Sequence, residues 1–238
     1  AAPILKAIQE MGYESPMPVQ EEVIPFLLGD DNDVIALAQT GTGKTAAFGL
    51  PILQKIDVTT YHPQALVLCP TRELCLQIAD DLNDYSKYID NLKVLPVYGG
   101  SSIESQIKTL KRGVHVVVAT PGRLLDLMNR KTVDLSLVKN VIMDEADEML
   151  NMGFTDSINA ILAEVPENRN MLLFSATMPK EIANITKKYM KNPKEIVIGN
   201  KNEGNKNIRD IYYMVQARDK YLALKRIADF YPNIYGIV

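Results

Sequence analysis

The chain has 238 residues, of which 47% are apolar and 23% are charged, a composition typical of a folded globular protein rather than a disordered or fibrous one. No stretch approaches the roughly 20 consecutive apolar residues of a membrane span, and the first residues lack the basic and then apolar pattern of a signal peptide. The net charge of −3 argues against a generally basic nucleic-acid binder, and two cysteines and two histidines are too few for a disulfide framework or a zinc cluster. We therefore expect a cytoplasmic protein with no membrane partner and with reduced, buried cysteines.

The first thirty residues predict two short helices. Residues 3–11 place four apolar side chains on one helical face, namely Ile4, Leu5, Ile8 and Met11. The sequence Pro-Met-Pro at 16–18 introduces a second helix, which contains Pro25. Because an internal proline removes a backbone hydrogen bond and clashes with the preceding turn, we expect Pro25 to kink or shorten this helix.

From about residue 30 to residue 200, short apolar runs alternate with helical patterns. The predicted strands are Val34–Ala38, Ala65–Cys69, Val94–Tyr98, Val114–Ala119, Val141–Met143, Met171–Phe174 and Glu195–Ile198. The predicted helices include Lys44–Ile56, Arg72–Tyr88, Pro121–Asn129, Phe154–Glu164 and Lys180–Met190. Several strands are continuously apolar, as expected when both faces of a sheet are covered. This order predicts an α/β fold with a mostly parallel central sheet, helices on both faces, and ligands at the carboxyl ends of the strands.

The sequence after this domain, which we place at 1–198, changes character. Residues 199–207 contain no apolar side chain and are typical of a linker. A strand at Ile211–Val215, a helix at Lys220–Phe230 and an apolar run at Ile234–Val238 are predicted to follow. A β-α-β unit by itself cannot cover both faces of its sheet, so we expect 208–238 to be the start of a second domain that the sequence does not complete.

A glycine-rich loop follows the first predicted strand and precedes a helix. It consists of Ala38, Gln39, Thr40, Gly41, Thr42, Gly43, Lys44 and Thr45. Such a loop turns its backbone N–H groups inward around phosphates, and the helix start adds partial positive charge. Lys44 is then placed for the β and γ phosphates and the Thr45 hydroxyl for Mg²⁺. Ala38 replaces the usual first glycine, and the alternative is a turn that only closes a βα junction.

Two acidic residues follow the predicted strand Val141–Met143. Asp144 is placed at the carboxyl edge of the sheet, where its carboxylate can hold Mg²⁺ directly or through water. Glu145 is the next residue and could orient or deprotonate an attacking water. Taken alone, the pair could equally cap the following helix. Together with the phosphate loop, it predicts a catalytic set of Lys44, Asp144 and Glu145.

A third polar motif, Ser175-Ala176-Thr177, follows the sixth predicted strand. Hydroxyl groups at this strand end can reach the Asp147 carboxylate. The same triplet could instead cap the helix near Pro179.

These motifs together resemble those of the DEAD-box ATP-dependent RNA helicases. Seven segments match in the family's order, namely Gly12-Tyr13 through Pro16-Met17-Pro18-Val19-Gln20, Ala38–Thr45, Pro70-Thr71-Arg72-Glu73-Leu74 with Gln77, Gly99-Gly100, Thr120-Pro121-Gly122-Arg123, Asp144-Glu145-Ala146-Asp147 and Ser175-Ala176-Thr177. The resemblance extends from about residue 3 to the end of the chain. It implies a RecA-like P-loop domain that uses ATP and Mg²⁺ to remodel RNA.

The resemblance also implies roles for individual residues at the nucleotide. Gln20 would read adenine through a bidentate amide contact, with Tyr13 helping to form the adenine pocket. Asp147, Ser175 and Thr177 would couple the nucleotide state to RNA binding and domain closure.

The RNA contacts implied by the resemblance are polar or small residues along the sugar-phosphate backbone. They are Pro70, Thr71, Arg72, Gly99, Gly100, Thr120, Pro121, Gly122 and Arg123. Hydroxyls, backbone amides and two arginines can hold phosphates without a generally basic face, which agrees with the net charge. Backbone contact also predicts little sequence preference.

The chain departs from the family pattern at both ends. The family's isolated aromatic residue, which stacks on adenine, would precede residue 1, and the second RecA-like domain would continue beyond Val238. The second domain's arginines, which reach the γ-phosphate in the family, would also lie there. We therefore expect the 238 residues to bind ATP and RNA weakly and to turn over little ATP by themselves.

Other functions are compatible with part of the pattern. Asn200-Lys201-Asn202-Glu203 superficially resembles a guanine-reading element, but Glu203 stands where such an element has aspartate, and no Asp-x-x-Gly follows a strand. A second alternative is an ATP-dependent RNA clamp or ribonucleoprotein remodelling factor without processive unwinding. The presence of Lys44, Thr45, Asp144 and Glu145 argues against a protein that has lost its chemistry.

Overall fold

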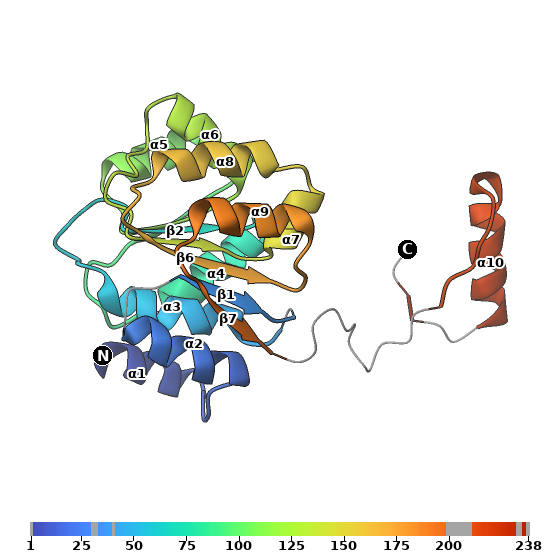
Figure 1. Cartoon of the computed structure of the whole chain (residues 1–238), viewed down its shortest axis with the longest axis horizontal. Coiled ribbons are helices and arrows are strands. Elements are labelled where there is room, and N and C mark those ends of the chain that lie inside the picture. The colour runs from blue at the N-terminus through green and yellow to red at the C-terminus, as the bar shows by residue number, and fades with distance from the viewer. Residues whose placement is uncertain (1, 30–32, 40, 199–210, 232–234, 237–238) are drawn as a thin grey trace. The chain divides into compact units, whose positions relative to one another are not determined.

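Seven strands form one parallel sheet in the computed structural model, which describes residues 2–29, 33–39, 41–198, 211–231 and 235–236 (Figure 1). The strands are β1 (Val34–Leu37), β2 (Ala65–Leu68), β3 (Val94–Val97), β4 (Val116–Ala119), β5 (Asn140–Met143), β6 (Asn170–Ser175) and β7 (Lys194–Val197). Their order across the sheet is β3-β4-β2-β5-β6-β1-β7, and every neighbouring pair runs parallel. All carboxyl ends therefore lie on one edge of the sheet.

Helices cover both faces of the sheet, as the alternating pattern predicts (Figure 1). One face carries α1 (Ala2–Glu10), α2 (Pro18–Leu28), α3 (Lys44–Lys55) and α4 (Arg72–Tyr85). The other carries α5 (Ile103–Lys111), α6 (Pro121–Asn129), α7 (Ala146–Asn151), α8 (Thr155–Glu164) and α9 (Lys180–Tyr189). The predicted α/β fold is confirmed.

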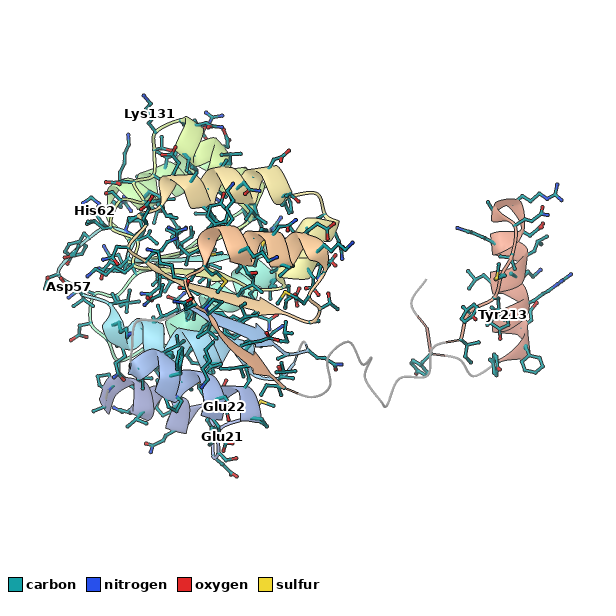
Figure 2. All side chains as sticks on the ribbon, in the orientation of Figure 1. Glu21, Glu22, Asp57, His62, Lys131 and Tyr213 are labelled. Atoms are coloured by element: carbon teal, nitrogen blue, oxygen red, sulfur yellow. The ribbon has the colours of Figure 1, made fainter. Side chains whose placement is uncertain are left out.

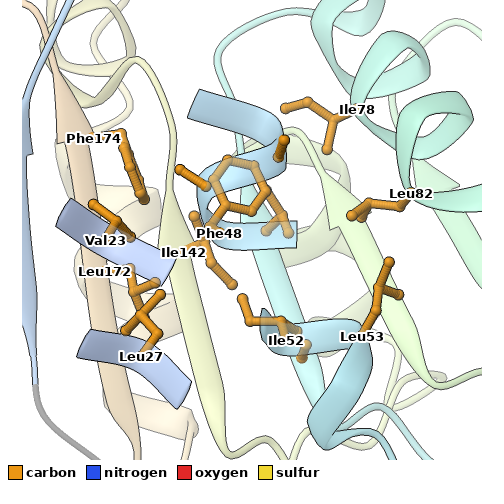
Figure 3. Packing of buried hydrophobic residues seen from close by; sticks show 14 of the residues in the cluster. Val23, Leu27, Phe48, Ile52, Leu53, Ile78, Leu82, Ile142, Leu172 and Phe174 are labelled. Atoms are coloured by element: carbon orange, nitrogen blue, oxygen red, sulfur yellow. The ribbon is translucent and has the colours of Figure 1, made fainter. Parts of the chain in front are cut away.

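Each face of the sheet has its own hydrophobic core, because successive strand residues point to opposite sides. In β1, Val34 and Ala36 join the core under α1–α4, whereas Ile35 and Leu37 join the core under α5–α9. Figure 3 shows the first core, in which Phe48 packs against Phe174 with ring centroids 5.3 Å apart. The two cysteines, Cys69 and Cys75, are free and fully buried in this core, as expected.

Helix α2 continues through its internal proline. The helix extends three residues past Pro25, to Leu28, and the Gly29 N–H donates to the Pro25 carbonyl (3.1 Å). Val19, Val23 and Leu27 are buried, so packing of one face offsets the hydrogen bond that proline cannot make.

Helix α5 was not among the predicted helices. Its signal was present, since Ser102 caps the first turn and the apolar positions that follow have helical spacing.

The chain divides into two compact units, 1–202 and 203–238. The proposed linker at 199–207 lies outside the described residues. In the second unit α10 (Lys220–Phe230) forms as predicted, after a 3₁₀ turn at Ala217–Asp219. The predicted strand Ile211–Val215 is wrong, because 211–216 form neither helix nor strand. A strand needs a neighbour for its backbone groups, and the described part of this unit contains none.

Side chains of the second unit are largely exposed. Figure 2 shows Tyr213 on this unit, where it is 56% exposed, and no residue of α10 is buried. This unit therefore has no hydrophobic core of its own among its described residues. No helix in the described parts of either unit is long and apolar enough to cross a membrane.

A buried histidine holds the loop between α3 and β2, on which Figure 2 marks Asp57 and His62. The Lys93 N–H donates to His115 Nδ1 (3.0 Å), so Nε2 carries the proton and donates to the Val58 carbonyl (3.2 Å). The ring is fully buried, and burial lowers the pKa of His115 below its usual value. The folded chain therefore favours neutral His115.

We expect His115 to make folding stability fall with acidification. The unfolded chain binds this proton more readily, so the free energy of unfolding should decline as pH drops below about 6.5, by up to about 1.4 kcal/mol per pH unit. Urea unfolding at pH 8 and pH 5.5 checks this, with His115→Gln expected to remove part of the pH dependence. His62→Gln changes the only other histidine, which is half exposed, and serves as the control. Equal pH dependence in all three proteins would contradict the assignment.

Candidate functional site

The motif residues lie along the carboxyl edge of the sheet in two adjacent groups. The phosphate loop follows β1, Asp144 follows β5, and Ser175 ends β6; these three strands are neighbours. Thr71, Gly99 and Thr120 come after β2, β3 and β4. These three strands are also neighbours and form the other end of the sheet. The strand order thus separates the residues expected at ATP from those expected at RNA.

The phosphate loop depends on glycine at two positions. Gly41 and Gly43 have φ values of 80° and 81°, a left-handed conformation that glycine adopts without steric cost. A Cβ on Gly43 would lie 2.4 Å from Gln20 Nε2 and 2.7 Å from Met17 Sδ. Thr42 Oγ1 braces the turn by donating to the Gln39 carbonyl (2.7 Å), whereas Thr40 lies outside the described residues.

Ala38 replaces the pattern's first glycine without strain. It is 2% exposed and is not among the described residues with positive φ. Its N–H donates to the Ser175 carbonyl (3.0 Å), and its own carbonyl accepts from Lys44 Nζ (3.4 Å). An alanine side chain fits in the core at this point, so the departure from the pattern does not disturb the loop.

A buried ion pair lies beneath the phosphate loop. Lys44 Nζ is 3.7 Å from Asp144 Oδ1, and these two side chains are only 6% and 4% exposed. Burial raises the pKa of the Asp144 carboxyl, while the Lys44 ammonium lowers it and the nearby Glu145 raises it. Lys44 at the start of α3 and Asp144 at the end of β5 form a buried polar centre that can bind a phosphate and a hard cation.

Glu145 has an uncommon backbone conformation. Its φ and ψ are both 50°, the left-handed region that a non-glycine residue rarely occupies. Its N–H donates to Asp144 Oδ1 (3.0 Å), which orients the buried carboxylate. Backbone strain of this kind often occurs at functional sites. Here the strained residue, Glu145, lies between Asp144 of the ion pair and the start of α7.

The oxygen groups near Lys44 fit a magnesium ion. Mg²⁺ prefers oxygen ligands and usually takes one or two from the protein while keeping waters, and Asp144 and Thr45 supply a carboxylate and a hydroxyl. No group of three His, Cys, Asp or Glu side chains in the described residues forms a richer metal site. The Thr45 side chain hydrogen-bonds to Asp81, whose pKa is raised chiefly by burial and lowered by this bond.

Gln20 connects α2 to the phosphate loop. Its Oε1 accepts from the Met17 N–H (2.9 Å) and its Nε2 donates to the Gly43 carbonyl (3.1 Å). The amide is therefore oriented by α2 and touches the last glycine of the loop. Tyr13 is 42% exposed, and its hydroxyl lies 3.1 Å from the Tyr85 hydroxyl.

The motif after β6 is tied to the acidic motif after β5. The Thr177 hydroxyl donates to Asp147 Oδ2 (2.7 Å), and its N–H donates to the same oxygen (3.0 Å). The Ser175 hydroxyl, by contrast, donates to the Thr177 carbonyl (2.7 Å). Thr177 thus makes the bridge expected of the hydroxyls, and the buried Ser175 supports it.

In the other half of the edge, Arg72 lies beside the Gly99-Gly100 turn. Thr71 caps α4 by accepting from the Leu74 N–H (3.2 Å), so that Arg72 starts the helix. The Arg72 guanidinium lies 5.1 Å from the Tyr98 ring centroid, and a Cβ on Gly100 would be 3.7 Å from its Nη1. Pro70 is buried beneath this helix start.

The segment after β4 places Arg123 under the same turn. Thr120 and Pro121 are buried at the start of α6, whereas Gly122 is exposed. Arg123 donates from Nη1 and Nη2 to the Ser101 carbonyl (3.1 and 3.2 Å) and from Nη1 to Gln106 Oε1 (3.0 Å). The structure therefore brings all three predicted RNA segments together.

Several residues of this edge were not predicted from the sequence. Asp81 and Tyr85 of α4 touch the nucleotide half, and Tyr98 and Gln106 touch the other half. Helical spacing alone could have indicated Gln106, a polar residue on the apolar face of α5. The remaining contacts join residues far apart in sequence and have no local signal.

Comparison with known proteins identifies a family and relatives for this chain. The sequence model of the DEAD/DEAH box helicase family matches residues 17–185. The chain is 49% identical over 96% of its length to "ATP-dependent RNA helicase DeaD" of Mycobacterium tuberculosis, of which it covers 40%, and 46% identical over 96% to the Escherichia coli protein of that name, of which it covers 36%. It thus spans about two fifths of the length of these relatives.

A solved structure agrees as well. The crystal structure of a DEAD box protein from Methanococcus jannaschii is 43% identical, with a TM-score of 0.80 over 96% of this chain and 61% of that one. The fold is therefore RecA-like, as the resemblance implied. This chain belongs to the DEAD/DEAH box helicase family.

Proposed function

We propose that this chain is the ATP-binding half of an RNA-dependent ATPase that unwinds RNA duplexes locally. The observation that carries the proposal is the buried pair of Lys44 and Asp144 beneath a glycine loop, beside a second group of RNA-type motifs on the same sheet edge. The relatives' names, ATP-dependent RNA helicase, support it. A second RecA-like domain in the same protein is part of the proposal, as is a location in the cytoplasm, which suits two free cysteines.

In this proposal each residue of the nucleotide half has a defined task. Bound ATP and Mg²⁺ supply a reactive phosphoanhydride and a cation that stabilises charge on the phosphates. Lys44 and the loop N–H groups bind phosphate oxygens, and Thr45 and Asp144 hold the metal. Glu145 accepts the proton of the attacking water. Gln20, with Tyr13, recognises the adenine edge.

RNA binding in this proposal relies on backbone contact rather than on a basic surface. Thr71, Arg72, Gly100 and Thr120 lie on the half of the edge that β2, β3 and β4 form. Hydroxyls, amides and arginine suit phosphate oxygens and read no base, so little sequence preference is expected. The hydrogen bond from Thr177 to Asp147, which lies two residues after Glu145, would transmit the nucleotide state to the RNA half.

The proposal predicts that nucleotide controls RNA affinity. Fluorescence anisotropy of a labelled single-stranded RNA is measured with no nucleotide, with ADP, and with a non-hydrolysable ATP analogue and Mg²⁺. We expect the tightest binding with the analogue and similar affinities for RNAs of different sequence. Equal affinity in all three states, in a chain shown to bind ATP, would contradict the proposal. Equal displacement of the analogue by GTP would contradict adenine recognition by Gln20.

An ATP-dependent clamp or ribonucleoprotein remodelling factor remains the alternative. Such a protein would retain the nucleotide-controlled RNA binding but would not separate strands processively. A strand-displacement assay with a protein that includes the relatives' remaining length, run beside the anisotropy titration, separates the two.

A further inference from the structure

A buried amide on α5 holds the Gly99-Gly100 turn from below. Gln106 is 6% exposed and is not part of any predicted motif. Its Nε2 donates to the Tyr98 carbonyl (3.2 Å) and to Ser101 Oγ (2.8 Å), and its Oε1 accepts from Arg123 (3.0 Å). One side chain therefore contacts the residues on both sides of the two glycines.

Arg123 completes the support of this turn. Its two bonds to the Ser101 carbonyl and one to Gln106 use both terminal nitrogens of the guanidinium. An arginine that serves mainly as a phosphate ligand would direct this fork to solvent. Here the fork faces the protein, beneath the turn.

The turn presents unsatisfied backbone donors to solvent. Gly99 and Gly100 are exposed, and within the described residues their N–H groups form no hydrogen bond. Gly100 has a φ of 81°, a conformation unfavourable for other residues. Exposed N–H groups in a glycine turn of this kind can bind an anion such as a phosphate, and Arg72 lies beside them.

The chemistry of Gln106 suits this task specifically. The Tyr98 carbonyl and Ser101 Oγ receive its two N–H donors, and the guanidinium of Arg123 meets its oxygen. A carboxylate at the same position would place an acceptor against the Tyr98 carbonyl, and an apolar side chain would leave that carbonyl and a guanidinium nitrogen with fewer partners.

We propose that Gln106 is a positioning residue for RNA binding, and that Arg123 acts with it to fix the Gly99-Gly100 turn rather than as a direct phosphate ligand. The inference rests on the proposed function, because the turn is taken to bind an RNA phosphate. It assigns the phosphate contact to the backbone N–H groups of the turn. Arg123 then contributes to RNA affinity through Ser101 and Gln106.

The first experiment requires no RNA. Backbone ¹⁵N relaxation is measured on Gly99 and Gly100 in the unmodified chain and in Gln106→Leu, Gln106→Glu and Arg123→Gln. We expect the backbone order parameters of the two glycines to be about 0.85 in the unmodified chain and below about 0.6 in the three variants. Gln9→Leu, which changes an exposed glutamine of α1, serves as the control. Unchanged order parameters in the Gln106 variants would overturn the proposal, whether or not the chain binds RNA.

The second experiment separates positioning from direct contact. Affinity for a single-stranded RNA is measured over a range of salt concentration, with binding of an ATP analogue as the check on folding. Gln106→Leu and Arg123→Gln should each weaken RNA binding about tenfold, with ATP affinity unchanged. The slope of log affinity against log salt should stay as in the unmodified chain, and the double variant should be little weaker than either single one.

A direct phosphate contact by Arg123 predicts a different result. The salt slope would then fall by about 0.7 in Arg123→Gln, and the effects of the two substitutions would add. Either outcome would overturn the positioning role of Arg123. If the unmodified chain bound no RNA, the proposed function would fail, while the relaxation measurements would still decide whether Gln106 fixes the turn.

Discussion

Glu145→Gln is expected to lower RNA-stimulated ATP turnover by about 10²–10⁴-fold, the usual contribution of a general base, while ATP binding persists. Glutamine has nearly the same shape but cannot accept the proton of the attacking water at neutral pH. ATP-dependent RNA retention should therefore remain or increase, because the nucleotide stays intact.

The structure explains why this substitution should leave the site in place. The contact that orients Asp144 comes from the backbone N–H of residue 145 (3.0 Å), which glutamine keeps. Lys44 lies 3.7 Å from Asp144, and glutamine removes a neighbouring negative charge that raises the pKa of Asp144, so this ion pair should persist. A large loss of turnover with unchanged binding would thus report on chemistry rather than on folding.

The measurement compares phosphate release and RNA retention in this chain and in a longer protein that carries the relatives' remaining length. Glu148→Gln changes the same residue type on α7, the helix that Glu145 precedes, where Glu148 is exposed, and should leave turnover within about twofold. Loss of both turnover and ATP-dependent RNA retention in Glu145→Gln would contradict the general-base role.

Much of the sheet could be predicted from the sequence because several of its strands are continuous apolar runs. Val116–Ala119, for example, is buried along its whole length, so the run itself marks a strand covered on both faces. The strand predicted at Ile211–Val215 fails for a tertiary reason, because 211–216 lack the neighbouring strand that an extended segment requires.

The nucleotide site was also largely predictable, since its chemistry is local. The loop from Gly41 to Thr45 and the Asp144–Glu145 pair each follow a strand directly, so the parallel sheet brings them to one edge. The sequence could not show that the Ala38 carbonyl and Asp144 share the Lys44 ammonium. That arrangement depends on the order of β1, β6 and β5 in the sheet.

The RNA half was less predictable in its details. The resemblance identifies Arg123 and the two glycines, but it treats them as parallel contacts on one ligand. In the structure Arg123 and Gln106 meet beneath the turn, although they lie 17 positions apart in the chain. A hydrogen bond of this kind leaves no periodic pattern, because it joins a helix face to a loop through one buried amide.

Lys44→Met is expected to weaken binding of ATP with Mg²⁺ by at least about 100-fold, because the ammonium contributes charge-assisted hydrogen bonds to phosphate oxygens. Methionine fills a similar volume but carries no charge. It also leaves Asp144 buried without the cation that lowers its pKa, so that pKa should rise further.

The rise in pKa gives the variant a pH signature. A carboxyl whose pKa is higher in the folded chain than in the unfolded chain destabilises the fold as pH rises above the unfolded value of about 3.9. The free energy of unfolding lost on Lys44→Met should therefore be larger at pH 8 than at pH 5. Breaking a buried pair typically costs about 3–5 kcal/mol, and protonation of Asp144 limits that cost at the lower pH.

Titration calorimetry with an ATP analogue and urea unfolding at the two pH values test both parts. Lys55→Met lies at the exposed end of the same helix, and it should retain ATP affinity. Unchanged ATP affinity in a folded Lys44→Met protein would contradict the phosphate role of Lys44. A loss of stability that is equal at pH 5 and pH 8 would instead show that Asp144 does not depend on the lysine for its charge. The two readouts therefore distinguish the contact of Lys44 with phosphate from its contact with Asp144, which a single affinity measurement would merge.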